Sequence, residues 1–405
     1  MSIKNTFNNL KQRGFIKQVV FQDQLESLLN SKPTTFYVGF DPTADSLHIG
    51  HYIPIMAMIH LQRAGHRPII LIGGGTGLIG DPSGKIDMRA VLTKETAKSN
   101  TDSFKAQLSK FFSFEGSNAA IIVDNIDWLK DLGYIDFLRE IGAHFSVNRM
   151  LSADCYKQRL EKGLTFIEFN YMLMQSYDFL QLYKKYDCVL QVGGDDQWSN
   201  ILSGADLIRR KEKGEAFALT LPLLTNSDGA KMGKTIKGAL WLDKNKLPPY
   251  EFYQYFRNVE DTKVEECLKL LTFLELDEIE TLTKFKDERI NAAKERLAYE
   301  VTKLIHGSDE ADTAKALAKG AFGDGAIMPT ITLNQSQDFS IVDLLVEIKI
   351  AATKSEARRL IEGGGIKIDD KKIESINHLI KDYCLPAQNE FIVHKGKKVH
   401  IKIKL

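Results

Sequence analysis

Two short apolar runs separated by one helical pattern constrain the fold of this chain more than any other feature. Phe36–Phe40 (FYVGF) has the length and composition of a buried strand, and so does Pro68–Gly73 (PIILIG). A D-P-T break follows the first run, and Asp45 or Ser46 is placed to cap a helix that runs to about Ala64. Because a strand–helix–strand unit joins parallel strands, the sequence predicts an α/β domain with a parallel sheet.

The same alternation continues to about residue 225. Apolar runs and helical patterns take turns, which is typical of a Rossmann-like, doubly wound parallel sheet. Further strands are expected at residues 119–123 and 187–192, and helices at about 88–112, 128–142, 166–183 and 197–211. In folds of this kind, ligands bind beyond the carboxyl ends of the strands, so motifs at those ends are candidates for ligand binding.

The composition changes after this α/β domain, which we place at residues 1–225. Residues 226–247 are rich in Gly and Lys and are expected to be a mobile loop and connector. Residues 248–327 read as mostly helical, and residues 328–338 as a linker. Residues 339–405 predict a small α+β domain that ends in an alternating strand, and they hold 13 Lys and Arg against 9 Asp and Glu.

The composition of the whole chain excludes several classes of protein. With 405 residues, 43% of them hydrophobic, and a net charge of +1, the chain is an ordinary globular protein and not a whole-surface polyanion binder. It has no run of 18 apolar residues, so no membrane span is expected. Its four cysteines are scattered, which favours a reducing compartment, and hence the cytoplasm, over a disulfide framework or a cysteine zinc site.

The first 22 residues carry four basic residues and no acid, which resembles an organelle transit peptide. We prefer to interpret them as an amphipathic N-terminal helix of the folded domain, because motif-bearing strand sequence begins as early as Phe36.

The stretch Gly73–Lys85 (GGGTGLIGDPSGK) imitates two nucleotide-binding motifs. Gly75, Gly77 and Gly80 spell G-x-G-x-x-G, but D-P-S-G interrupts the helix that a dinucleotide fingerprint should open. A P-loop would need Gly at position 79 and Ser or Thr at position 86, and both positions hold Ile. Neither an NAD site nor a P-loop is therefore expected.

A stronger signal lies upstream, where His48-Ile49-Gly50-His51 begins a helix directly after a strand. Helix N-terminal amides and imidazole donors can meet phosphate oxygens, and Gly50 would let an adenine ring approach the backbone. A structural hydrogen bond is the ordinary role of a single histidine here. The four-residue string at a helix start is much rarer by chance and indicates an ATP site without a P-loop.

The glycine-rich loop contains a second signal, Lys231-Met232-Gly233-Lys234-Thr235. Two ammonium groups three residues apart on a mobile loop can neutralise the charge that builds on a leaving pyrophosphate. Alone, such a loop is more often merely solvated and basic. Together, H-I-G-H in the first βαβ unit and K-M-G-K-T just after the sheet resemble the two signatures of class I aminoacyl-tRNA synthetases.

Further segments narrow this resemblance to bacterial-type tyrosyl-tRNA synthetases, over essentially the whole chain. The C-terminal segment Thr353–Ile361 (TKSEARRLI), with Gly363–Gly365 behind it, is similar to the S4-like RNA-binding module. The catalytic segments that resemble this family are Tyr37–Thr43 (YVGFDPT), Gly77–Lys85 (GLIGDPSGK), Tyr171–Asp178 (YMLMQSYD) and Gln191–Trp198 (QVGGDDQW).

The resemblance implies a tyrosine site. Tyr37 and Asp178 would contact the phenol hydroxyl, and a phenylalanine would leave these polar groups unpaired. Gln191 would also bind the tyrosine. The α-ammonium group would be bound by Asp81, Tyr171 and Gln175. Positions 171, 175 and 178 fall on one face of a helix, so their convergence on one ligand is geometrically possible.

The resemblance also implies an ATP site. The signature K-M-S-K-S has Ser where this chain has Gly233, which puts any hydroxyl role there in doubt, and Thr235 replaces its final Ser. The implied ATP and adenylate ligands are Gly39, Asp41, Thr43, His48, Gly50, His51, Gly193, Asp196 (on the ribose hydroxyls) and Gln197. The implied pyrophosphate contacts are Lys85, Arg89, Lys231, Lys234 and Thr235.

By the same resemblance, the tyrosine carboxylate attacks the α-phosphorus of ATP, and the tRNA terminal ribose then attacks tyrosyl-adenylate. Mg²⁺ would accompany ATP, and no protein-bound metal or organic cofactor is expected. Residues 248–327 would bind the anticodon region of tRNA(Tyr), and the family is homodimeric. In the S4-like domain, the expected phosphate contacts are Lys354, Arg358, Arg359 and Lys367. Neither a membrane nor DNA is expected as a partner.

Two alternatives remain at this point. A tryptophanyl-type synthetase shares the fold and both signatures, although Tyr37, Asp178 and the S4-like tail favour tyrosine. A non-catalytic RNA-binding paralogue would also share the fold. The intact histidines and lysines of the two signatures argue against such a loss of activity.

Overall fold

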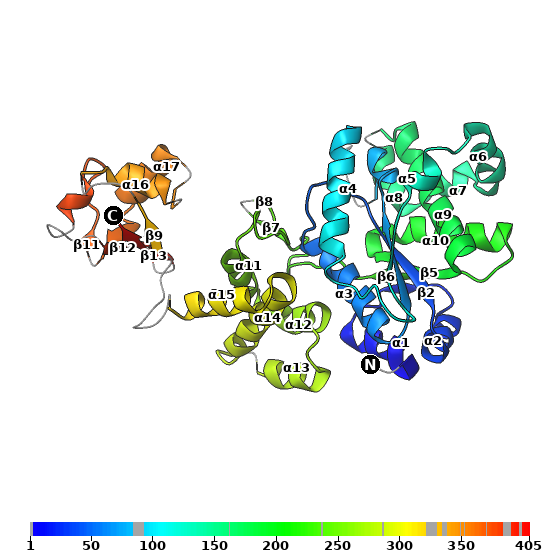
Figure 1. The fold of residues 1–405 in the computed structure, drawn as a ribbon, viewed down its shortest axis with the longest axis horizontal. Helices are drawn as coiled ribbons and strands as arrows, with labels where there is room; N and C mark the ends of the chain where they lie inside the picture. The colour runs from blue at the N-terminus through cyan, green and yellow to red at the C-terminus, as the bar shows by residue number, and fades with distance from the viewer. Residues whose placement is uncertain are drawn as a thin grey trace. The chain divides into compact units, whose positions relative to one another are not determined.

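The computed structural model describes residues 3–83, 93–161, 163–235, 238–285, 287–320, 330–333, 338–348, 350–351, 353–369, 371–383, 390–396 and 399–405. The chain folds into two compact units (Figure 1). The first unit comprises Met1–Pro248 with Tyr255–Ile305, and the second comprises Pro249–Gln254 with His306–Leu405. The five-part division expected from the sequence remains a prediction.

A six-stranded sheet forms the centre of the first unit, in the order β1-β6-β5-β2-β3-β4. All neighbouring strands are parallel except β1, which runs antiparallel to β6 at the edge. The predicted doubly wound sheet is therefore confirmed, with one antiparallel edge strand added. The strands are β1 Gln18–Val19, β2 Thr35–Phe40, β3 Arg67–Ile72, β4 Ile121–Asp124, β5 Cys188–Gly194 and β6 Phe217–Leu221.

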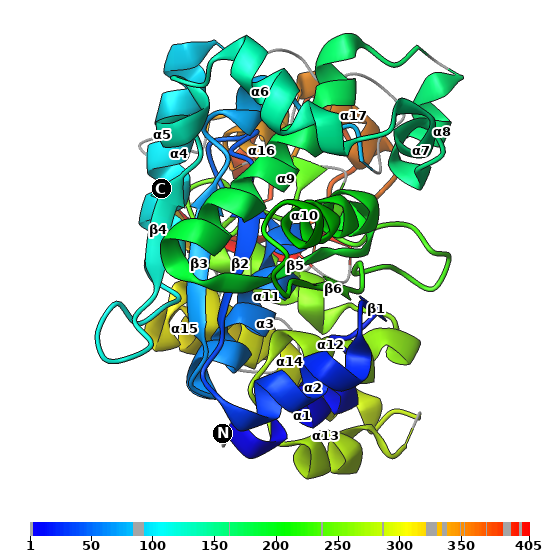
Figure 2. The ribbon, with the colours of Figure 1, turned by 90° about the vertical axis from the view of Figure 1, so that its right-hand side faces the viewer.

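Helices lie on both faces of this sheet (Figure 2). The long helices α9 and α10 pack against each other and against β5, whereas α3 packs against β2 and β3. The described helices of this part are α1 Thr6–Arg13, α2 Gln22–Ser31, α3 Ile49–Arg63, α4 Lys94–Leu108, α5 Ile126–Leu129, α6 Tyr134–Glu140, α7 Val147–Leu151, α8 Asp154–Leu160, α9 Phe166–Tyr186 and α10 Trp198–Lys211.

Two predicted helices differ in extent from those observed. The stretch at 128–142 is divided into α5, α6 and a 3-10 turn at Gly142–His144, because Gly133 adopts an extended backbone and restarts the chain at α6. The helix expected at 88–112 is observed as α4, and residues 84–92 lie outside the described residues.

The N-terminal segment forms the amphipathic helix α1, in agreement with the interpretation that we preferred to a transit peptide. Phe7 and Leu10 of α1 are buried, and the Arg13 guanidinium donates to the carbonyl oxygens of Lys269, Thr272 and Leu274 at 3.3, 3.3 and 2.8 Å. Lys269 lies in the last turn of α12, and Thr272 and Leu274 follow that helix. The last carbonyls of a helix have no hydrogen-bond partner within it. Arg13 therefore ties α1 to the helical segment that follows the sheet.

The helices after the sheet follow the short hairpin of β7 (Lys234–Thr235) and β8 (Gly238–Ala239). They are α11 Pro249–Arg257, α12 Val264–Leu271, α13 Leu276–Thr283, α14 Ile290–His306 and α15 Ser308–Gly320. Among all described residues, no helix is long and apolar enough to span a bilayer.

The second unit contains a separate sheet in the order β11-β10-β12-β13-β9, with its own apolar core. The alternating C-terminal sequence forms β13, as predicted, and pairs with β12 and β9. The elements are β9 Thr330–Thr332, α16 Ile341–Glu347, α17 Lys354–Glu362, β10 Ile366–Ile368, β11 Lys371–Lys372, β12 Glu390–Lys395 and β13 Val399–Lys404.

Candidate active site

The strand order places a topological switch point between β2 and β5. The chain leaves β2 toward β3 on one side and leaves β5 toward β6 on the other. In open α/β sheets, the ligand-binding crevice lies at the carboxyl ends of two such strands. Gly39 near the end of β2 is exposed, and a Cβ added there would meet no heavy atom within 4 Å. A glycine on a central strand that faces open space indicates close approach of a ligand to the backbone.

Four largely buried polar residues lie on the elements beside this point, and we call the site that they define the Asp178 pocket. Tyr37 on β2 is directly opposite Gln191 on β5, and Asp178 and Gln175 come from α9. Tyr37, Asp178 and Gln191 are 0%, 2% and 3% exposed. The Tyr37 hydroxyl and the Oε1 atoms of Gln175 and Gln191 are buried without a hydrogen-bond partner among the described residues. Because an unpaired buried polar atom is costly, three together indicate a polar ligand.

The Asp178 carboxylate accepts two hydrogen bonds that the sequence did not reveal. Asn125 Nδ2 donates to Oδ2 at 2.9 Å, and Trp128 Nε1 donates to Oδ1 at 2.7 Å. Burial raises the pKa of Asp178 to about 7, even though both donors favour the charged form. Burial and the nearby Asp178 charge also raise the pKa of Tyr37, so this phenol stays protonated.

A hydrogen-bond network joins this pocket to the end of β2. Asn125 Nδ2 also donates to Thr76 Oγ1 at 2.9 Å, and Thr76 Oγ1 donates to Asp41 Oδ1 at 2.8 Å. The Tyr171 hydroxyl donates to the other Asp41 oxygen at 2.7 Å. The predicted residues Asp41, Tyr171 and Asp178 are thus brought together through Asn125 and Thr76, which the sequence analysis missed. Asn125 could have been noticed as a polar residue at the end of a strand.

Asp81 lies in a second cluster of polar side chains. Gln197 Nε2 donates to Asp81 Oδ2 at 2.6 Å, and the Ser83 amide donates to Oδ1 at 2.9 Å. Asn200, another residue missed by sequence reasoning, donates to Ser83 Oγ at 3.0 Å. The structure therefore brings together Asp81, predicted for the tyrosine ammonium, and Gln197, predicted for the adenylate.

The two histidines of H-I-G-H cap α3 themselves. The Gly50 amide donates to His48 Nδ1 and the His48 amide donates to His51 Nδ1, both at 3.1 Å. The prediction that Asp45 or Ser46 caps this helix was wrong. Ser46 is buried and its hydroxyl has two acceptors within reach, the Leu47 carbonyl and Gln107 Oε1, whereas Asp45 forms an ion pair with Lys246.

The K-M-G-K-T loop lies beside the start of α3. The Ile49 amide donates to the Leu240 carbonyl, and the Leu242 amide donates to the Leu47 carbonyl, both at 2.9 Å. Lys231 forms a 3.1 Å ion pair with Asp196. The two sequence signatures are therefore neighbours in space, and two residues predicted for different parts of ATP are in contact.

The remaining predicted residues are placed as follows. Thr43 and Gly50 are exposed near the start of α3, and a Cβ at Gly193 would lie 3.0 Å from Ile201. Lys234 and Thr235 form β7, although their side chains lie outside the described set. Lys85 and Arg89 also lie outside the described residues. The residues predicted to contact tRNA, namely Lys354, Arg358, Arg359 and Lys367, are exposed on α17 and β10 of the second unit.

The glycine stretch that imitates a dinucleotide fingerprint follows β3 and forms a short 3-10 turn, Thr76–Leu78. In the described part of this stretch, the turn stands where a dinucleotide fingerprint would open a long helix. The turn instead supplies the Gly75 amide, which donates to Asn125 Oδ1 at 2.8 Å. Its glycines therefore help to hold the Asp178 network.

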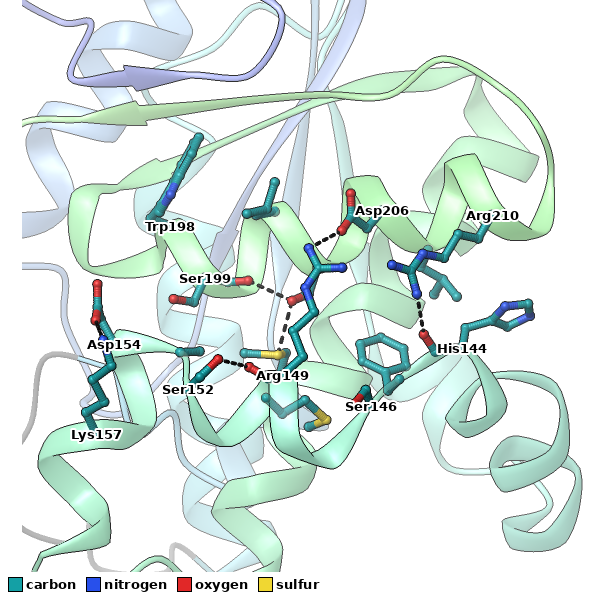
Figure 3. Close-up of a pocket in the computed structure, with 17 residues that line it drawn as sticks. His144, Ser146, Arg149, Ser152, Asp154, Lys157, Trp198, Ser199, Asp206 and Arg210 are labelled. Carbon is teal, nitrogen blue, oxygen red and sulfur yellow. Dashed lines mark hydrogen bonds and ion pairs between the residues drawn. The ribbon is translucent and has the colours of Figure 1, made fainter.

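A separate pocket of about 310 Å³ lies between α7, α8 and α10 (Figure 3). Two of its basic side chains are already paired, Arg149 with Asp206 at 2.7 Å and Lys157 with Asp154 at 2.6 Å. Arg210 donates to the His144 carbonyl at 3.1 Å. No residue predicted for tyrosine or ATP lines it. Within the described part of the chain, no three His, Cys, Asp or Glu side chains gather to hold a metal ion.

Comparison with known proteins gives a consistent result. Residues 29–323 match the family of class I tRNA synthetases (W and Y), and residues 321–403 match the tyrosine–tRNA ligase SYY-like C-terminal domain. The chain is 56% identical to the tyrosine–tRNA ligase of Acetivibrio thermocellus over 100% of both chains. It is also 56% identical to that of Clostridium tetani over 98% of both.

Among solved structures, the chain is similar to a C-terminally truncated mitochondrial tyrosyl-tRNA synthetase from Aspergillus nidulans. The identity is 32% and the TM-score 0.70, over 76% of this chain and 92% of that one. A tryptophanyl specificity is not favoured, because the full-length relatives are tyrosine–tRNA ligases. The chain therefore belongs to the tyrosine–tRNA ligases, a family of class I aminoacyl-tRNA synthetases.

Proposed function

We propose that the pocket around Asp178 binds the phenol of L-tyrosine. The observation that carries this proposal is the set of orphaned buried atoms: the Tyr37 hydroxyl and the Oε1 of Gln191. A phenol hydroxyl is both donor and acceptor, so it can donate to Asp178 and accept from Tyr37. Phenylalanine would leave these groups unpaired, and tyrosyl-tRNA synthetases are the usual illustration of that rule.

The substrate ammonium group is proposed to bind Asp81, Tyr171 and Gln175. Asp81 supplies the negative charge, and the Gln175 Oε1 is an acceptor without a partner among the described residues. The Tyr171 hydroxyl donates to Asp41 at 2.7 Å, and its oxygen would accept from the substrate ammonium. The carboxylate at the other end of tyrosine would then face the crevice at the end of β2, where Gly39 leaves space.

ATP is proposed to bind at the start of α3. The helix amides and the imidazoles of His48 and His51 would meet the phosphates, with Thr43 and Gly50 beside them. Gly39, Asp41, Gly193, Asp196 and Gln197 would line the adenylate. Mg²⁺ is proposed to enter with ATP and to be held by phosphate oxygens and water, as is usual for this ion.

Tyrosine activation then needs no nucleophile from the protein. The substrate carboxylate attacks the α-phosphorus in line, the bond to pyrophosphate breaks, and tyrosyl-adenylate forms. Lys231, Lys234 and Thr235 of the loop, together with Lys85 and Arg89, would stabilise the charge on the leaving pyrophosphate. A terminal ribose hydroxyl of tRNA(Tyr) then attacks the mixed anhydride and takes the tyrosyl group.

The tRNA is proposed to bind residues 248–327 and the basic surface of the second unit, where Lys354, Arg358, Arg359 and Lys367 are exposed.

We also propose that the protein is a homodimer. Five large apolar side chains between α6 and the start of α9 are more than half exposed: Tyr134, Ile135, Val147, Phe166 and Ile167. Sedimentation equilibrium tests this assembly. The scattered cysteines support a location in the cytoplasm.

The central test is tyrosine-dependent ATP–pyrophosphate exchange, with phenylalanine and tryptophan as competing amino acids. Exchange with tyrosine alone is expected. Asp178→Ala is expected to abolish measurable tyrosine binding in equilibrium dialysis, and Asp178→Asn, which keeps the shape, is expected to weaken it strongly. If both variants bind tyrosine with the wild-type dissociation constant, Asp178 does not belong to the tyrosine pocket.

A further inference from the structure

The backbone of Gly233, at the centre of the K-M-G-K-T loop, is held on both sides. Its amide donates to the hydroxyl of Tyr255 on α11 at 2.9 Å. Its carbonyl accepts from the Leu240 amide at 2.8 Å, and the Leu240 carbonyl accepts from the Ile49 amide at 2.9 Å. A continuous run of hydrogen bonds therefore leads from Tyr255 through the loop to the first residue of α3.

The backbone conformation and the surroundings of Gly233 leave no room for a side chain at this position. Its φ is +87°, a left-handed conformation that favours glycine, and a Cβ added there would lie 2.2 Å from Ile49 Cγ2. The loop backbone therefore lies directly on the side chain that follows His48. Any movement of the Gly233 amide changes how the flanking residues, Lys231 and Lys234, stand relative to the start of α3.

A second contact comes from the same helical segment. The Glu260 carboxylate accepts from the Ser227 amide at 3.0 Å, near the beginning of the loop. Tyr255 and Glu260 both belong to the segment Tyr255–Ile305, which packs with the sheet in the first unit. Two side chains from this segment thus hold two backbone amides of the loop.

We propose that Tyr255 is a positioning residue for tyrosine activation. Its hydroxyl accepts the Gly233 amide and thereby holds the K-M-G-K-T loop against the start of α3, with its lysines at the ATP site. Tyr255 does not touch the substrates and acts through the loop. Burial raises the pKa of this phenol, so the hydroxyl stays neutral and available as an acceptor. The inference rests on the proposed role of Lys231 and Lys234 at the pyrophosphate.

The variant that tests this proposal is Tyr255→Phe. It removes the hydroxyl and keeps the ring, whose centroid lies 5.3 Å from that of Phe256. Loss of one neutral hydrogen bond predicts a roughly threefold to tenfold slower single-turnover release of pyrophosphate. The tyrosine dissociation constant and the melting temperature should stay near wild type. Tyr250→Phe, which removes the hydroxyl of another tyrosine of α11 that hydrogen-bonds Gln254, is the matched control.

A double-mutant cycle separates positioning from a merely structural effect. In a background that lacks both loop lysines (Lys231→Ala with Lys234→Ala), Tyr255→Phe should slow activation by less than about twofold, because the two charged groups that Tyr255 positions are then absent. An equal slowing in both backgrounds would overturn the proposal, and so would an unchanged or faster rate for Tyr255→Phe alone. If instead the variant that lacks both lysines activates tyrosine at the wild-type rate, the lysines have no role at the pyrophosphate. The proposed function of the loop then fails, and with it the premise of the Tyr255 proposal.

Discussion

The indole N–H of Trp128 offers a direct way to change the charge of Asp178 without touching the carboxylate. It donates to Asp178 Oδ1 at 2.7 Å, and the carboxylate is only 2% exposed. Trp128→Phe keeps an aromatic ring and removes this donor. Because the donor stabilises the ionised form, its loss is expected to raise the pKa of Asp178 further above its value of about 7.

The magnitude follows from the strength of a hydrogen bond to a charged group, about 1.5–3 kcal/mol. At about 1.4 kcal/mol per pKa unit, this raises the Asp178 pKa by roughly one to two units. At pH 7.5 the ionised share then falls from about three quarters to about a quarter or less. If the carboxylate is the form that accepts the phenol proton, tyrosine affinity at that pH falls by about threefold to twenty-five-fold.

The assay is equilibrium dialysis of tyrosine between pH 6 and 8.5. Wild type should lose affinity as the pH falls through about 7, where Asp178 becomes protonated. In Trp128→Phe this loss should begin at a higher pH, so that the two curves converge toward pH 8.5. Trp198→Phe, a tryptophan that lines the separate pocket, is the control and should follow wild type.

One result would refute this reasoning. If Trp128→Phe weakened tyrosine binding by the same factor at every pH, the indole would act through packing alone and not through the protonation of Asp178. Asn125 remains as the other donor to Asp178 in the variant, at 2.9 Å, so complete loss of the carboxylate charge is not expected.

Two further predictions concern the loop and the second unit. Gly233→Ala places a methyl group 2.2 Å from Ile49 Cγ2, so we expect activation to slow at least about tenfold with unchanged tyrosine affinity; wild-type pyrophosphate exchange would contradict the packing argument. Reversing Arg358 and Arg359 to Glu should weaken tRNA binding and lower its salt dependence without slowing adenylate formation. Lys381→Glu is the control, and an unchanged tRNA dissociation constant at fixed salt would exclude these contacts.

The central strands were predictable because each is an apolar run of ordinary length bounded by breakers. The edge strand β1 and its pairing with β6 were not predictable. β1 has only two residues, too few for any periodicity, and it exists because its backbone pairs with β6. Where the local signal is weak, the structure depends on pairing partners about 200 residues away, such as Gln18 with Thr220. A single sequence does not reveal such pairs.

The residues of the candidate site also include some that the sequence predicts and some that it does not. Tyr37, Asp178 and Gln191 could be named because they stand in recognisable segments, and the structure brings them together. Asn125 and Trp128 could not be assigned to Asp178, because they lie 53 and 50 residues from it in the chain. Their role arises from the sheet order, which places the end of β4 near α9. The sequence thus predicts the groups that would touch substrate better than those that set their charge.

The unexpected cap of α3 also determines which nitrogen of each histidine carries the proton. Nδ1 of His48 and Nδ1 of His51 each accept a backbone N–H. In a neutral imidazole, one nitrogen accepts and the other carries the proton, so both rings must carry theirs on Nε2. The two histidines thus close the helix through Nδ1. In the proposed ATP site, their Nε2–H groups would face the phosphate oxygens as donors.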